Sequence, residues 1–171
     1  MADLTPKDRL QPSLLDRLTD DEPDKQQEGR DKRILSMRGL RRAVLRDLGW
    51  IFNSSHLALL QDLSAFPLAF HSVINYGCPD FSGKTASGLD VTELAYVLRD
   101  TIWDFEPRIL RDSLEVTALV NQSNLKHPNE IDFEVRGQLW GQPLPEQLYL
   151  RTEVDLDIGE IRLFDTDARG A

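Results

Sequence analysis

Apolar residues recur at spacings of three and four in two stretches of the chain. They are Leu40, Val44, Leu48, Ile51 and Phe52 in residues 36–52, and Leu94, Val97, Leu98, Ile102 and Phe105 in residues 91–105. This spacing predicts two helices that each bury one side. Ser36 is a candidate N-cap for the first helix, and Asp90 or Thr92 for the second.

Beyond residue 113 the apolar period changes to two, which is typical of strands with one buried face. The alternating segments cover residues 114–120, 131–138, 148–156 and 160–164. Asp157-Ile158-Gly159 separates the last two segments and predicts a turn, so the chain should end in a hairpin.

The helical patterns come first and the strand patterns last, without strand-helix-strand alternation. This order predicts an α+β fold in which N-terminal helices pack on a small mixed or antiparallel sheet. Residues 148–156 are the candidate edge strand, and Leu150, Thr152 and Val154 are its candidate partner-binding residues. An ordinary closed sheet is the alternative.

The N-terminal part of the chain differs in composition from the rest. Residues 20–32 contain no aliphatic or aromatic side chain and carry a proline and a glycine, which predicts a tether. Ahead of it, Ser13 can cap a short helix that presents Leu14, Leu15 and Leu18. These leucines either dock on a partner or fold back on their own domain.

The domain organisation expected from these patterns has three parts. They are an arm over residues 1–33, a folded domain over residues 34–166 and a tail over residues 167–171. The length supports one hydrophobic core and leaves little chain for a second.

The chain is acidic, with 20 Lys and Arg against 29 Asp and Glu and a formal net charge of −9. Such a charge opposes binding to a nucleic-acid backbone, so we expect no nucleic-acid partner. Positive charge concentrates in residues 30–46, on and before the first predicted helix. It forms a solvated helix face, or it meets an acidic protein or a nucleic acid.

The sequence favours a cytoplasmic protein without direct membrane insertion. No stretch reaches the roughly 18 consecutive apolar residues of a membrane span, and residues 1–15 lack an apolar signal core. The single cysteine, Cys78, cannot form an internal disulfide or a thiolate metal site.

One segment is close to a phosphate-binding loop but lacks its spacing. Gly77 and Gly83 follow the strand-like residues 72–76, yet five residues separate these glycines where the motif requires four. Pro79 also removes one backbone donor, so we interpret the segment as a turn.

No catalytic site, metal site or cofactor is predicted. The histidines lack the close spacing of metal ligands; they are His56, His71 and His127. Ser54 and Ser55 precede His56 without a nucleophile-elbow motif, and capping of a helix end accounts for them. Asp104 and Glu106 are weak candidates for the paired carboxylates of a glycoside hydrolase, because acidic residues are abundant.

Five strings in order resemble the TssE family: SLLDRL, LRRAVLRDLGWIFN, SVINYGCPD, IWDFEPRI and LRTEVDLDIGEIRL. They span residues 13–164. TssE proteins are baseplate subunits of bacterial type VI secretion systems, similar to the small wedge protein of contractile phage tails. The family often carries a lysozyme label that its members do not bear out. The resemblance therefore implies a non-enzymatic structural component, and a peptidoglycan glycan hydrolase is the alternative.

The resemblance also implies partners and a place of assembly. TssE-like proteins join TssF and TssG in a wedge, alongside TssK, and couple the baseplate to the contractile sheath of TssB and TssC. The spike and the inner tube lie near this assembly, which forms at the inner face of the cytoplasmic membrane. The terminal hairpin would then template attachment of the first sheath ring.

The Glu-Pro-Arg motif of the family falls on Glu106, Pro107 and Arg108. Pro107 would end the second helix, since a proline disfavours the helical conformation of the residue before it. Glu106 and Arg108 would form ion pairs and hydrogen bonds, either between wedge subunits or within the chain. The chain departs from the family at Cys78 and Phe81, where aliphatic residues are expected.

Overall fold

The computed structural model describes residues 13–19, 24, 36–84, 88, 90–119, 129–141 and 145–166. The predicted tether, apart from residue 24, and the predicted tail after residue 166 lie outside the described residues.

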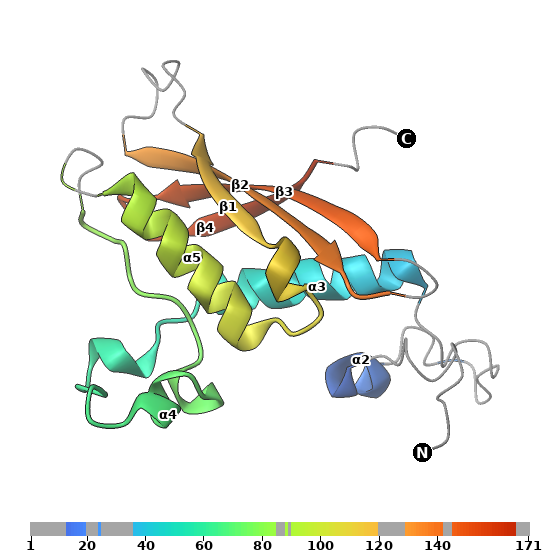
Figure 1. The fold of residues 1–171 in the computed structure, drawn as a ribbon, viewed down its shortest axis with the longest axis horizontal. Helices are drawn as coiled ribbons and strands as arrows, with labels where there is room; N and C mark the ends of the chain where they lie inside the picture. Colours follow the sequence, from blue (N-terminus) through green and yellow to red (C-terminus); the bar gives the residue numbers. More distant parts are fainter. Residues whose placement is uncertain are drawn as a thin grey trace.

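Two long helices, α3 (Met37–Phe52) and α5 (Val91–Phe105), lie on one face of a sheet (Figure 1). The Ser36 hydroxyl caps α3 by accepting a hydrogen bond from the Gly39 N–H, and the Asp90 carboxylate caps α5. Both predicted helices are therefore confirmed, with Asp90 as the cap of the second. The shorter helices are α2 (Leu14–Leu18), η2 (Leu57–Leu59), α4 (Pro67–Phe70), η3 (Val73–Asn75) and η5 (Arg111–Ser113).

Four antiparallel strands of the described chain form one sheet in the order of the sequence. They are β1 (Glu115–Leu119), β2 (Glu130–Leu139), β3 (Glu146–Asp155) and β4 (Ile161–Asp165). The turn between β3 and β4 contains Gly159 at φ +75°, a conformation that favours glycine. The α+β fold with a C-terminal hairpin is confirmed.

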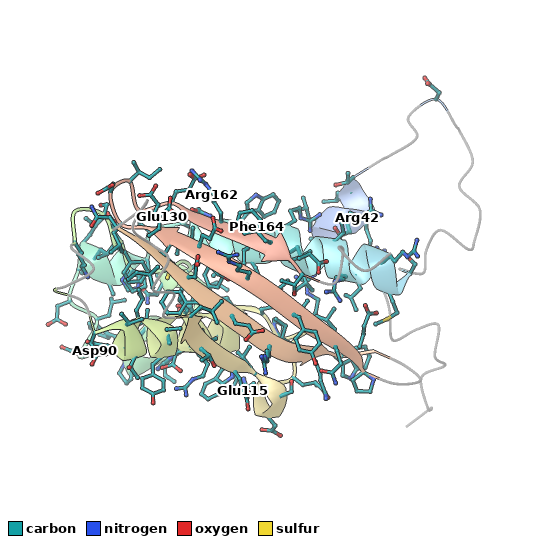
Figure 2. All side chains as sticks on the ribbon, turned by 90° about the horizontal axis from the view of Figure 1, so that it is seen from above. Arg42, Asp90, Glu115, Glu130, Arg162 and Phe164 are labelled. Atoms are coloured by element: carbon teal, nitrogen blue, oxygen red, sulfur yellow. The ribbon has the colours of Figure 1, made fainter. Side chains whose placement is uncertain are left out.

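The prediction that residues 148–156 form an edge is wrong. β3 pairs with β2 along its whole length, and it also pairs with β4 from Leu150 to Val154. The edges are β1 and β4, which Figure 2 marks by Glu115 on one side and by Arg162 and Phe164 on the other.

Residues Leu150, Thr152 and Val154 are fully buried. They alternate along a central strand, so that all three point to the face that packs on the helices. Their side chains cannot meet a partner in the folded domain, which corrects their assignment as partner-binding residues.

The core lies between the helices and one face of the sheet. Its fully buried members include Leu48 of α3, Leu98 and Ile102 of α5, Phe133 of β2 and Leu148 of β3. Each such side chain contributes about 1.5–3 kcal/mol through its removal from water. The other face of the sheet carries a cross-strand ion pair between Arg151 of β3 and Asp132 of β2 at 2.8 Å.

Residues 57–76 form a separate lobe of short helices between α3 and α5, here called the 57–76 lobe (Figure 1). The strand-like residues 72–76 are not a strand, because Val73–Asn75 is the 3-10 helix η3. The buried Asn75 amide holds this helix in place: its oxygen accepts from the Ala58 N–H, and its nitrogen donates to the Phe70 carbonyl.

The ends of the lobe are joined by a short parallel bridge between Ser55 and Cys78. The Cys78 N–H donates to the Ser54 carbonyl at 2.8 Å. The side chain that caps the end of α3 is Asn53, whose amide donates to the Gly49 carbonyl. The serines were therefore the wrong candidates for this cap.

Candidate interaction site

The Glu-Pro-Arg segment forms a tight corner at the end of α5. The Glu106 N–H makes the last helical hydrogen bond, to the Ile102 carbonyl at 2.8 Å. Pro107 follows and is exposed, and the chain reverses so that Arg108 reaches back to Glu106. Arg108 Nε donates to Glu106 Oε1 at 2.6 Å, and Arg108 Nη2 donates to Glu106 Oε2, which makes a two-pronged pair.

A third charged group joins this pair from the other long helix. Arg108 Nη2 also donates to Asp47 Oδ2 of α3 at 2.6 Å. We call Glu106, Arg108 and Asp47 the corner cluster. Glu106 is only 2% exposed, whereas 23% of the Arg108 side chain is exposed. The cluster thus braces α3 against the end of α5 and still presents an arginine to the surface.

The electrostatics of the cluster follow from this arrangement. Burial alone would lower the pKa of Arg108, but Glu106 and Asp47 outweigh it and raise the pKa above its ordinary value. Burial and the same two carboxylates raise the pKa of Tyr76. The ring of this tyrosine, which belongs to the 57–76 lobe, packs on Phe105, the residue before Glu106. Arg108 therefore remains charged at any pH at which the protein folds.

The line of charges continues to the N-terminal helix α2. Arg46 donates from Nε to Asp47 Oδ1 at 2.8 Å and from Nη1 to Asp16 Oδ1 of α2 at 2.6 Å. Asp16 also closes a capping box with Ser13, as expected for a helix that begins there. Partial burial opposes ionisation of Asp16, but Ser13 and Arg46 outweigh it and lower the pKa of Asp16.

The three candidate docking leucines of α2 point away from the domain. Leu14, Leu15 and Leu18 are all exposed, and α2 has no buried residue. Their folding back into the core is not observed. The polar pair between Asp16 and Arg46 holds α2 in place.

Two arginines of the basic face of α3 are paired within the chain. Arg41 donates to Asp165 from Nε and Nη2 at 2.7 and 2.6 Å, and to Glu146 at 3.3 Å. Arg46 pairs with Asp16 and Asp47. The expectation of a solvated basic face therefore does not hold for these two arginines, which instead neutralise acidic residues from distant parts of the sequence.

The structure brings Glu106, Pro107, Arg108 and α2 to one region and leaves Leu150, Thr152 and Val154 in the core. Sequence reasoning missed Asp47, Arg46 and Asp16 as members of this region. Because 30 residues separate Asp16 from Arg46, and 61 separate Asp47 from Arg108, no local spacing could have revealed the pairs.

The carboxylates suggested by the hydrolase alternative are already engaged. Asp104 Oδ2 lies 2.7 Å from His71 Nδ1, and both oxygens of Glu106 accept from Arg108. A glycoside hydrolase requires two carboxyl groups that reach the substrate from opposite sides of a cleft. The buried position of Glu106 does not meet this requirement.

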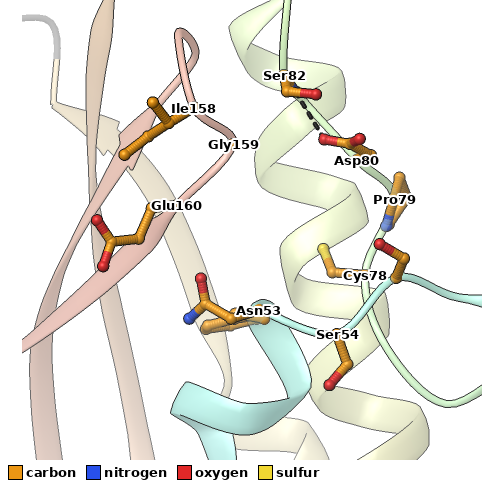
Figure 3. A pocket seen from close by; sticks show the side chains of 11 residues that line it. Asn53, Ser54, Cys78, Pro79, Asp80, Ser82, Ile158, Gly159 and Glu160 are labelled. Atoms are coloured by element: carbon orange, nitrogen blue, oxygen red, sulfur yellow. Dashed lines mark hydrogen bonds between the residues drawn. The ribbon is translucent and has the colours of Figure 1, made fainter.

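A polar pocket of about 320 Å³ lies between the β3–β4 turn and the loop after Gly77 (Figure 3). Asp80 accepts a hydrogen bond from the Ser82 N–H, which lowers the pKa of Asp80. Burial raises the pKa of the Cys78 thiol to about 12, so this thiol stays protonated and unreactive. Among the described residues, no group of His, Cys, Asp or Glu side chains could hold a metal ion.

The chain matches a known protein family over much of its length. The model of the family described as "Baseplate wedge protein gp25" matches residues 38–144, which is more than half of the chain. The chain belongs to this family. TssE proteins are members of the same family, so the recognition made from the sequence is confirmed at the family level.

Membership of the baseplate wedge family gives the chain a structural role in a baseplate and implies contacts with other baseplate proteins. The matched residues include the corner cluster and the 57–76 lobe, and they stop before β3. No curated protein and no solved structure matches the chain. No helix in the described ranges is long and apolar enough to cross a membrane.

Proposed function

We propose that this baseplate wedge protein is the TssE-type subunit of a type VI secretion baseplate. In this role it joins the wedge through TssF and TssG, lies alongside TssK, and templates attachment of the TssB/TssC sheath at the inner face of the cytoplasmic membrane. The spike and the inner tube lie nearby. The observation that carries the proposal is the corner cluster, in which a partly exposed arginine is held rigidly by two carboxylates.

The corner cluster is suited to binding a partner because Arg108 is positioned before the partner arrives. Glu106 and Asp47 engage Nε and Nη2, and no described residue engages Nη1. A carboxylate or carbonyl of a wedge protein can accept from Nη1 with little further loss of side-chain entropy. Exposed Pro107 supplies a rigid apolar surface beside it.

The arm is the second part of the proposed wedge contact. Leu14, Leu15 and Leu18 form an exposed apolar helix face, and the pair between Asp16 and Arg46 positions it near the corner cluster. We propose that residues 1–33 act as an arm that docks these leucines on a wedge partner, with residues 34–166 as the folded domain and residues 167–171 as a tail.

The hairpin contributes to sheath attachment through β4 in this proposal, and not through β3. Ile161, Leu163 and Asp165 of β4 point their backbone groups away from β3, as the alternating register requires. The Asn53 amide already occupies both backbone groups of Ile161, at 2.8 and 2.9 Å. An added sheath strand would therefore pair at Leu163, beyond the residue that Asn53 occupies.

The proposal is tested by exchanging Arg108 for lysine. Arg108→Lys keeps one positive charge for Glu106 but loses the fork that can serve Glu106, Asp47 and a partner together. We expect binding to the TssF–TssG pair, measured by co-purification and by titration, to weaken by at least about tenfold. Arg136→Lys is the matched control, because Arg136 is an exposed arginine whose ion-pair partner in the described part of the chain is Glu134.

Two results would count against the proposal. One is wild-type affinity in Arg108→Lys when both variants melt normally. The other is the absence of any complex between the full chain and the TssF–TssG pair. The same titration with residues 1–30 removed measures the contribution of the arm separately.

A further inference from the structure

The 57–76 lobe exposes most of its large apolar side chains. The exposed residues are Leu59, Leu60, Phe66, Leu68, Phe70, Val73, Ile74 and Tyr76. Leu60 and Leu68 are each 90% exposed. Folded proteins rarely gather so many exposed apolar groups in one short segment unless the segment meets another surface.

The lobe does not use these side chains for a core of its own. Among its described residues, Leu63 is the one buried hydrophobic side chain, and the buried centre of the lobe is the polar Asn75. Asn75 joins η2, α4 and η3 through hydrogen bonds to Ala58 and Phe70. The lobe is therefore held together by polar contacts, and its apolar groups remain available.

The lobe is also attached firmly to the rest of the domain. Its two ends are joined at Ser54 and Cys78. His71 pairs with Asp104 near the end of α5, and the Tyr76 ring packs on Phe105 at 5.4 Å between ring centres. Little conformational entropy would be lost when a surface held in this way binds a partner.

The charges around the lobe indicate what kind of surface would cover it. Residues 57–76 contain no lysine or arginine, and Asp62 is exposed. Asp104 of α5 lies against the lobe, because its carboxylate contacts His71 at 2.7 Å. A second copy of this chain, with its net charge of −9, would bring like charges together. A basic partner is favoured instead.

We propose that the 57–76 lobe docks on an apolar surface with a basic rim, carried by a second baseplate protein. The Tyr76 ring packs on Phe105, the residue before Glu106 of the corner cluster, so the contact extends the one described above and rests on the proposed function. It differs from that contact in its chemistry: the corner cluster supplies a hydrogen-bonding arginine, whereas the lobe supplies apolar area.

The apolar part of the proposal is tested with Leu60→Ser and Leu68→Ser in the full chain, titrated with the purified TssF–TssG pair. Each change should weaken binding by roughly tenfold or more, because each removes a leucine that the complex buries. Ile158→Ser is the matched control, since Ile158 is also exposed but lies in the β3–β4 turn. The control should bind as the wild type does.

The charge of the rim is tested at Ala65, an exposed position of the lobe. Ala65→Lys and Ala65→Glu change the same site in opposite directions. Against a basic partner, Ala65→Glu should bind at least as well as the wild type and several-fold better than Ala65→Lys. Equal affinities, or the reverse order, would overturn the assignment of a basic rim.

The outcomes separate this inference from the proposed function. If Arg108→Lys weakens the complex while both serine variants bind as the wild type does, the lobe proposal fails and the proposed function stands. If no complex forms, both fail. If sedimentation of the chain alone shows a dimer that Leu60→Ser and Leu68→Ser dissolve, the lobe binds a second copy and the proposal is overturned.

Discussion

Gly77 is the residue on which the attachment of the 57–76 lobe depends most directly. Its φ of +123° is one that residues with side chains rarely adopt. A Cβ atom at this position would lie 2.2 Å from the Ser54 carbonyl oxygen, which accepts the hydrogen bond from Cys78. Any side chain must therefore break the junction between the two ends of the lobe.

Replacing Gly77 by alanine should lower the free energy of unfolding by more than about 3 kcal/mol, because backbone strain adds to the loss of a buried contact. Gly83→Ala is the matched control: Gly83 has φ +72° but nothing within 4 Å of its Cβ position. Gly83→Ala should lower the free energy of unfolding by only about 1–2 kcal/mol, because it adds the strain of the left-handed conformation alone. Urea denaturation measures the free energy of unfolding of both variants. Equal losses in the two would contradict the steric argument.

Cys78 and Phe81 show how burial explains a departure from an expected residue type. Both side chains are almost fully buried in the main core. A thiol and a phenyl ring are apolar enough to replace the aliphatic residues expected there. The departure therefore belongs to core packing and implies no separate chemistry.

At the scale of elements, α2 is held to the domain by charge and not by apolar packing. Its leucines are exposed, and the contact that fixes it is the pair between Asp16 and Arg46. Because the pKa of Asp16 is lowered in the folded state, this contact stabilises the fold at pH values above the pKa of Asp16 in the unfolded chain, which is about 4. The contribution is lost as the pH falls through the lower pKa of the folded state.

We therefore expect α2 to detach at acidic pH before the domain unfolds. Amide hydrogen exchange of residues 14–18 should accelerate as the pH is lowered below about 4, after correction for the intrinsic exchange rate. Amides of α3 provide an internal control, because its Ser36 cap does not titrate. In Asp16→Asn the exchange of α2 should be fast already at neutral pH. Equal protection of α2 in both proteins would show that another contact holds it.

At the scale of the whole molecule, the corner cluster joins parts that are distant in the sequence. Glu106 ends α5, Arg108 leads toward β1, and Asp47 belongs to α3. These contacts show that the Glu-Pro-Arg corner acts within the chain. Its contact with a partner, through the exposed side of Arg108, is the part that the proposal adds.

Glu106→Gln should lower the free energy of unfolding by about 3–5 kcal/mol, because it leaves much of the Arg108 charge uncompensated beside a buried site. Asp100→Asn is the control: it removes an equivalent charge from an exposed pair with Arg99, and the cost should stay below about 1 kcal/mol. Urea denaturation measures the free energy of unfolding of both variants. A loss at Glu106 as small as that at Asp100 would show that the pair does not brace the fold.

The sequence by itself determined the elements whose causes are local. The three-and-four spacing, the candidate caps Ser36 and Asp90 or Thr92, and the stop at Pro107 predicted α3 and α5, and the period of two predicted the strands. These features act between residues a few positions apart, so each can be recognised without knowledge of the rest of the fold. The short helix α2 and its Ser13 cap were predicted for the same reason, whereas the sequence left open whether its leucines are exposed.

Only the tertiary structure decided which segments meet. Whether β3 or β4 forms the edge depends on how the strands pair, and a period of two is the same in both positions. Arg108, Arg46 and Arg41 each have a partner 61, 30 and 124 residues away, where opposite charges are too common for sequence to select among them. The outward apolar side of the 57–76 lobe likewise appeared only once packing had shown which hydrophobic residues the core leaves out.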